Sequence, residues 1–94
     1  MYINQTNHYK NLLSQAEKLR RHNHQGSYKT RERYFEAYTR FLHYVADEYR
    51  LEKIANISAK HIESYIEYMQ ERELSASTIK TDLAAIRFWH DRIP

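Results

Sequence analysis

The 94-residue sequence contains no cysteine and has only one glycine and one proline. The absence of cysteine excludes disulfide bonds and thiolate metal sites. Gly26 and Pro94 lie outside the stretches of periodic hydrophobicity, so long segments of the chain contain nothing that breaks a helix. The sequence therefore predicts an all-α protein, because a sheet protein of this length needs more turn residues.

Long hydrophobic runs are also missing. No apolar stretch approaches the roughly 18–20 residues that span a membrane. Residues 1–10 lack the apolar core of a signal peptide. We therefore expect a cytoplasmic protein with no membrane partner, and a chain of 94 residues is long enough for one small domain.

The formal net charge is only +3, which does not by itself indicate a polyanionic partner. Its distribution is uneven. Residues 10–33 contain seven Lys or Arg against two Glu, whereas residues 51–72 contain three basic and four acidic residues. This asymmetry predicts one basic surface on an otherwise balanced domain, although a solvated helix face gives the same pattern.

Hydrophobic periodicity predicts four helices, at about residues 6–22, 28–50, 59–72 and 76–92. Serine precedes the last three as the expected N-cap, at Ser27, Ser58 and Ser75. On the fourth helix we place Trp89 at the edge of the inner line. Five other apolar residues are expected to pack against each other in the core: Phe41, Ile62, Ile66, Leu83 and Ile86.

Residues that could carry catalysis are not grouped in this sequence. Three of the nine tyrosines, Tyr34, Tyr38 and Tyr65, lie on apolar stripes and fit core positions better than a nucleophile's. The six histidines show no metal-ligand spacing, and there is no glycine-rich phosphate loop. We expect no catalytic residue, no metal and no cofactor, and therefore a binding domain.

Three blocks of sequence carry a family resemblance. The first places Thr30 four residues before Tyr34 and is followed by Phe41-Leu42, the second runs from Ile57 to Tyr65, and the third is SASTIKTDLAAIRFWH at residues 75–90. Their order and spacing resemble the N-terminal core-binding domain of tyrosine recombinases, the phage integrase family. The resemblance covers about residues 27–94, and the third block is its most specific part. It implies a small four-helix bundle with a SAM-like arrangement.

The resemblance also implies a role in DNA binding. In this family the domain clamps one face of duplex DNA at the recombination site, while a C-terminal catalytic domain holds the other face. Outward cations at Lys29, Arg33 and Lys80 agree with this independently. The positions that match the family's DNA contacts are Lys29, Thr30, Arg33, Ser77, Thr78, Lys80, Thr81 and Arg87.

The resemblance further implies a longer parent chain. The family's catalytic Arg, Lys, His-x-x-Arg and Tyr have no counterpart here, so we expect them in a C-terminal domain of the same full-length chain. A homo-oligomer on DNA is compatible with that role. We divide the sequence into residues 1–26, an N-terminal helix and joint that acts as an additional arm or packs on a neighbouring protomer, and residues 27–94, the core-binding domain.

Two features depart from the family, and other interpretations remain open. Residues 1–26 match the family pattern less clearly than the rest of the sequence. The family often has glycine in the loop before the last helix, where this sequence has Arg72-Glu73-Leu74, so the turn must be made another way. The main alternative is a helical protein–protein interaction module in which the apolar stripe of the first helix docks a partner. A helix-turn-helix regulator is a weaker alternative, because its short glycine-containing turn is missing.

Overall fold

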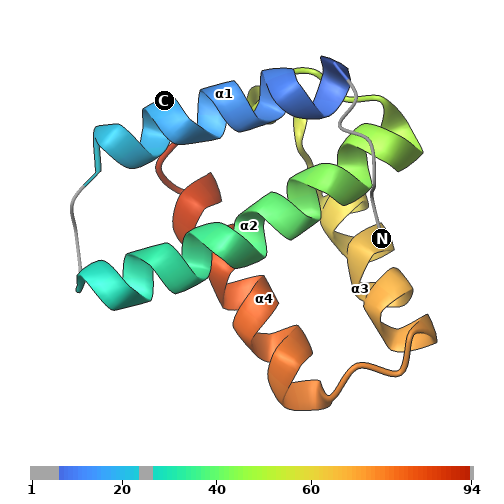
Figure 1. Ribbon diagram of the computed structural model, residues 1–94. Coiled ribbons are helices and arrows are strands. Elements are labelled where there is room, and N and C mark those ends of the chain that lie inside the picture. The colour runs from blue at the N-terminus through green and yellow to red at the C-terminus, as the bar shows by residue number, and fades with distance from the viewer. Residues whose placement is uncertain (1–6, 24–26, 94) are drawn as a thin grey trace.

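The computed structural model describes residues 7–23 and 27–93. These residues form four α-helices and one short 3-10 helix, with no strand among them. In chain order the elements are α1 (Asn7–Arg21), α2 (Tyr28–Tyr49), η1 (Ile54–Asn56), α3 (Ala59–Glu71) and α4 (Ala76–His90) (Figure 1). The predicted all-α fold is confirmed, and the predicted helix ends agree within two residues over the described chain.

Side chains fix the start of the last three helices. The Ser27 hydroxyl accepts a hydrogen bond from the Thr30 amide at the start of α2, and Ser75 does the same for the Thr78 amide of α4, both at 3.1 Å. At α3 the cap works differently, because Nδ1 of His61 accepts from the backbone N–H of Ser58 at 2.9 Å. Each bond satisfies a backbone donor that would otherwise have no partner within its helix.

Helix α2 is the centre of the bundle, with α1 antiparallel along one side and α4 crossing it on another (Figure 1). Near the start of α1, Tyr9 stacks on His43 with 3.5 Å between ring centroids. Near its end, Arg20 pairs with Glu32 and lies over the Phe35 ring. The apolar stripe of α1 is therefore buried in the same core as the rest of the chain, which removes the docking surface that the interaction-module interpretation requires.

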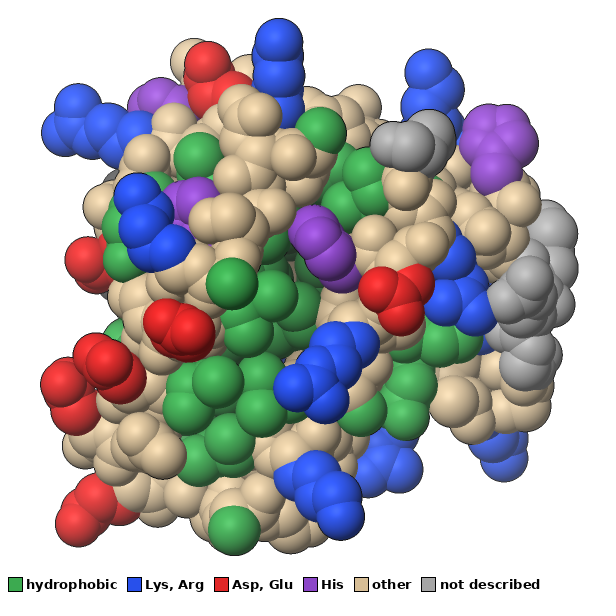
Figure 2. Space-filling view, turned by 180° about the vertical axis from the view of Figure 1, so that it is seen from behind, with side chains coloured by type: hydrophobic (Ala, Val, Ile, Leu, Met, Phe, Trp, Pro, Cys, Tyr) green, Lys and Arg blue, Asp and Glu red, His purple; other side chains and the backbone are tan. Residues whose placement is uncertain are grey.

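The core confirms part of the predicted packing and corrects the rest. Phe41 and Ile86 are fully buried, and the half-buried Ile62 packs against the core. Ile66 and Leu83 are only half-buried, and Figure 2 shows hydrophobic side chains at the surface over α3 and α4. Trp89, which we expected at an edge, has no exposed surface.

The error comes from the rotation of α4 about its own axis. Its buried residues follow the line Asp82, Ala85, Ile86 and Trp89, and so the inward face includes a carboxylate. Phe35 meets the Trp89 ring edge-on, with 5.7 Å between centroids, and this contact holds the tryptophan inside. Leu83 consequently turns toward the surface.

The loop between α3 and α4 makes its turn with a residue in the left-handed region. Glu73 has φ 57°, and the Leu74 amide donates to the carbonyl of Met69 at 3.2 Å. This is the bond pattern that glycine commonly completes after a helix. Glu73 therefore takes the left-handed conformation for which the family often uses glycine, and it completes the turn before α4.

Candidate nucleic-acid interface

A hollow of about 320 Å³ lies between the middle of α2 and the first half of α4. Four of the eight predicted DNA-contacting residues line it, and one of them, Arg33, is more than 40 positions from the other three in sequence. The lining residues are Arg33, Glu36, Ala37, Arg40, Ser77, Thr78, Thr81 and Asp82.

The other four predicted residues lie outside the hollow. Lys29 and Thr30 occupy the first turn of α2, and Lys80 and Arg87 lie on α4; all four are exposed. Half of the predicted DNA-contacting residues therefore line the hollow, and the other half lie elsewhere on the exposed surfaces of α2 and α4.

The predicted cations are available to a ligand. Within residues 7–23 and 27–93, none of Lys29, Arg33, Lys80 and Arg87 forms an ion pair with another side chain. Each is also exposed. Binding an anion through these side chains would break no ion pair of the folded domain.

Four lining residues, Glu36, Ala37, Arg40 and Asp82, were not among the predicted contacts, and two of them form an ion pair across the hollow. The guanidinium of Arg40 on α2 donates to a carboxylate oxygen of Asp82 on α4 at 3.0 Å. Asp82 is only 3% exposed, whereas the Arg40 side chain is 56% exposed. A buried carboxylate thus holds a cation that remains open to solvent. Asp82 shares a helical spacing with Ala85, Ile86 and Trp89, but the inward orientation of that line and the partner on α2 follow only from the fold.

Tyr65 of α3 is influenced by both members of this ion pair. Burial, and then the nearby charge of Asp82, raise the pKa of Tyr65 to about 12, while Arg40 acts in the opposite direction through its charge and a hydrogen bond. The tyrosine hydroxyl therefore stays protonated at neutral pH. The hydrogen bond to Asp82 restrains the Arg40 guanidinium, which reduces the conformational entropy it would lose on meeting a ligand.

The starts of α2 and α4 present similar groups. The Ser27 hydroxyl donates to the Thr30 hydroxyl oxygen at 2.8 Å, and Ser75 donates to that of Thr78 at 3.0 Å. Because each threonine oxygen accepts this bond, its own O–H is free to donate outward. Helix N-termini favour anions, so both places suit the oxygen atoms of a phosphate.

The described residues show little that suits other chemistry. They contain no group of three His, Cys, Asp or Glu side chains placed to hold a metal ion. Burial raises the pKa of Tyr38, as it does that of Tyr65, which disfavours a phenolate nucleophile at either position. None of the described helices has the length and apolar character needed to cross a bilayer.

Comparison with known proteins identifies the family. The family described as phage integrase, N-terminal, matches residues 10–91, which is most of the chain and includes nearly all of α1. No curated protein and no solved structure matched in the same comparisons. The matched range spans all four helices of an all-α, SAM-like bundle. On this evidence the chain belongs to the phage integrase N-terminal domain family.

Proposed function

We propose that this domain binds duplex DNA with the face formed by α2 and α4, as the core-binding part of a tyrosine-type site-specific recombinase. The observation that carries the proposal is the hollow between these helices, which brings Arg33 together with Ser77, Thr78 and Thr81. The family match supplies an independent reason to expect DNA as the partner. On this proposal residues 27–94 carry the DNA-binding face, and α1, within residues 1–26, packs against α2 and supports it; residues 1–6, 24–26 and 94 lie outside the described residues.

Each part of the face has a separate role in this proposal. The N-terminal turns of α2 and α4 offer the hydroxyls of Thr30 and Thr78 to phosphates. Lys29, Lys80 and Arg87 attract the polyanion from the flanks. Phosphate contacts of this kind position a protein on the duplex without recognising its sequence.

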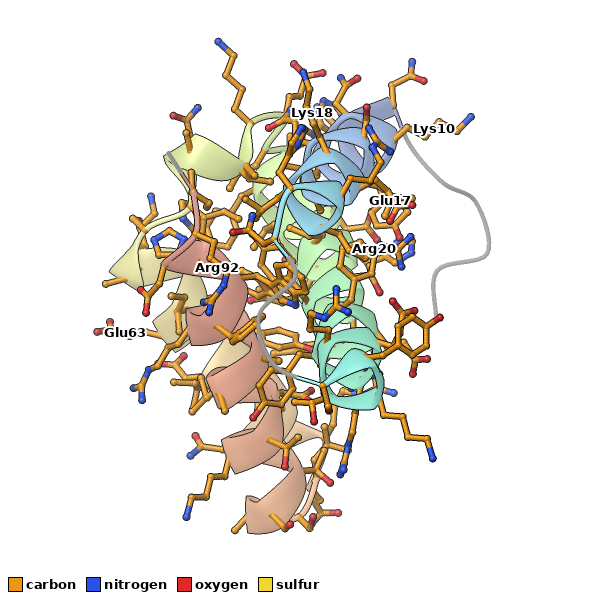
Figure 3. The ribbon with its side chains drawn as sticks, turned by 90° about the vertical axis from the view of Figure 1, so that its left-hand side faces the viewer. Lys10, Glu17, Lys18, Arg20, Glu63 and Arg92 are labelled. Atoms are coloured by element: carbon orange, nitrogen blue, oxygen red, sulfur yellow. The ribbon has the colours of Figure 1, made fainter. Side chains whose placement is uncertain are left out.

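The experiment that tests the face is a titration of a short DNA duplex into isotope-labelled protein, followed by amide chemical shifts. We expect the amides of residues 28–40 and 75–82 to shift together, because the hollow joins these segments. The outer face of α3 serves as the internal control; Glu63 points away from the bundle there (Figure 3). Shifts confined to α1 or to α3 would refute the proposed face.

We further propose that the domain has no catalytic centre and that strand cleavage belongs to a C-terminal domain of the full-length chain. The basis is chemical: a tyrosine nucleophile needs cations around the transferred phosphoryl group, and Tyr38 and Tyr65 are buried with raised pKa values. Incubation with supercoiled plasmid should yield no covalent protein–DNA adduct. A phosphotyrosine bond formed by this chain would contradict the proposal.

A further inference from the structure

The hollow between α2 and α4 carries no net charge, although it lies on the face that we assign to DNA. Two arginines, Arg33 and Arg40, line it together with two carboxylates, Glu36 and Asp82. A cleft that serves only to hold phosphate gains from cations and loses from each carboxylate, since like charges at close range repel. The acids therefore point to a ligand that offers hydrogen-bond donors as well as acceptors.

The two carboxylates are in different environments. Asp82 is buried and is bound by Arg40 at 3.0 Å, so its charge is compensated inside the fold. Glu36 is exposed and forms no ion pair with a described residue. Arg33 and Arg40 lie three residues before it and four after it, at spacings where opposite charges on a helix commonly pair. Because neither arginine forms an ion pair with Glu36, its carboxylate oxygens remain available to accept from a ligand.

We propose that Glu36 is a specificity-determining residue that accepts a hydrogen bond from the exocyclic amino group of cytosine in the major groove. The proposal rests on the proposed function and deepens it. Glutamate is suited to the cytosine amino group, and arginine to the O6 and N7 atoms of guanine. Glu36 and Arg33, one turn apart on α2, therefore present the acceptor and donor that a C·G pair requires.

The Glu36 carboxylate would increase the difference in affinity between DNA sequences and would not raise the affinity for DNA in general. An exposed carboxylate on a DNA-binding face repels the backbone of every sequence to the same degree. The repulsion is offset only where a base donates a hydrogen bond to the carboxylate. The difference in binding free energy between DNA sequences therefore increases. Phosphate contacts at the start of α4, through the Thr78 hydroxyl, would hold α2 in the register that this recognition needs.

The test measures base preference and affinity separately. Wild-type protein, Glu36→Gln and Glu36→Ala are each equilibrated with a pool of duplexes containing a randomised segment, and the bound fraction is sequenced. Wild type should enrich cytosine at one position by about tenfold over the other bases. Glu36→Gln should move the preference toward adenine, which glutamine recognises, and Glu36→Ala should abolish it. The matched control, Glu63→Gln on the outer face of α3, changes the net charge equally and should leave the preference unaltered.

The outcomes separate this inference from the proposed function. If wild type binds duplexes in a salt-dependent way but shows no base preference, the inference is wrong and DNA binding stands. It is also wrong if both Glu36 variants bind every sequence more tightly by the same factor, because the carboxylate then only repels. If wild type binds no duplex at all, the proposed function fails and the inference fails with it.

Discussion

At Glu73 the backbone adopts a conformation that its side chain disfavours. A residue with a Cβ in the left-handed region is less stable by roughly 1–2 kcal/mol than in the right-handed one. Glycine avoids most of this energy but is more flexible in the unfolded chain. The loop before α4 is consequently held in place by its flanking helices and not by its own sequence.

Replacement of this residue gives a direct test. We expect Glu73→Gly to stabilise the domain by about 1 kcal/mol, which for a domain of this size raises the Tm by about 4–8 °C. The control is Gln70→Gly, an exposed position inside α3, which should destabilise the domain by about 1 kcal/mol. Thermal unfolding of both variants checks the pair; destabilisation by Glu73→Gly would contradict the role assigned to the turn.

The ion pair between Arg40 and Asp82 could not be predicted from the sequence. The predicted inner face of α4 followed Leu83 and Ile86, with Trp89 at its edge, whereas the buried line of the helix includes Asp82 and Trp89. A buried acid is stable only with a partner, and that partner is on another helix. Sequence spacing cannot supply a contact between residues 42 positions apart.

At the scale of the helix, the start of α3 depends on the protonation state of His61. Its Nδ1 accepts from the Ser58 amide and must therefore be unprotonated. Burial, and then the neighbouring charge of Lys60, lower the pKa of His61. Above about pH 6.5, the pKa of histidine in the unfolded chain, His61 is neutral in both the folded and the unfolded protein, and the cap stabilises the fold fully. As the pH falls through that value, the unfolded chain takes up a proton first, so stability is lost.

We accordingly expect the free energy of unfolding to decrease between about pH 7.5 and pH 5.5, above the range of ordinary carboxyl titration. His61→Gln preserves the acceptor of the cap but does not titrate, so its decrease should be smaller. Burial also lowers the pKa of His43, so part of the pH dependence should remain in the variant. Denaturant unfolding at several pH values measures the free energy of unfolding of wild type and of His61→Gln. Identical pH profiles would show that His61 does not contribute to the pH dependence of stability.

The helices themselves were predictable to a close approximation. Their apolar periods and the serine caps at Ser27, Ser58 and Ser75 are local properties, and the structure places all four helices within two residues of the predicted ends. The rotation of each helix about its axis was less predictable. Trp89 turns inward because Phe35 of α2 receives it, a tertiary contact that no local pattern contains.

For the whole molecule, the central question is whether binding depends on the α2–α4 face or on net charge. The seven cations of residues 10–33 predict one basic surface. The structure divides these cations between α1 and α2, and Figure 3 shows Lys10 and Lys18 extending from α1. Half of the predicted contact residues meet at the hollow because α4 crosses α2, which only the fold determines.

The most direct measurement compares two charge reversals of equal size. Lys29→Glu with Arg33→Glu alters the proposed face, whereas Lys10→Glu with Lys53→Glu alters exposed cations on α1 and on the segment after α2. All four positions are exposed, and substitutions at such sites usually change stability by less than about 0.5 kcal/mol each, which circular dichroism verifies. The affinity of each protein for a short duplex is then measured across a range of salt concentrations.

Our account predicts that wild type makes about three to five phosphate contacts, with log K falling against log salt at a slope of about −3 to −4.5. Reversal of Lys29 and Arg33 should weaken binding by at least about tenfold and reduce the magnitude of the slope by about 1 for each phosphate contact that is lost. Reversal of Lys10 and Lys53 should weaken it far less. Equal losses from the two pairs would show that only net charge matters, and the α2–α4 face would not be the DNA-binding surface.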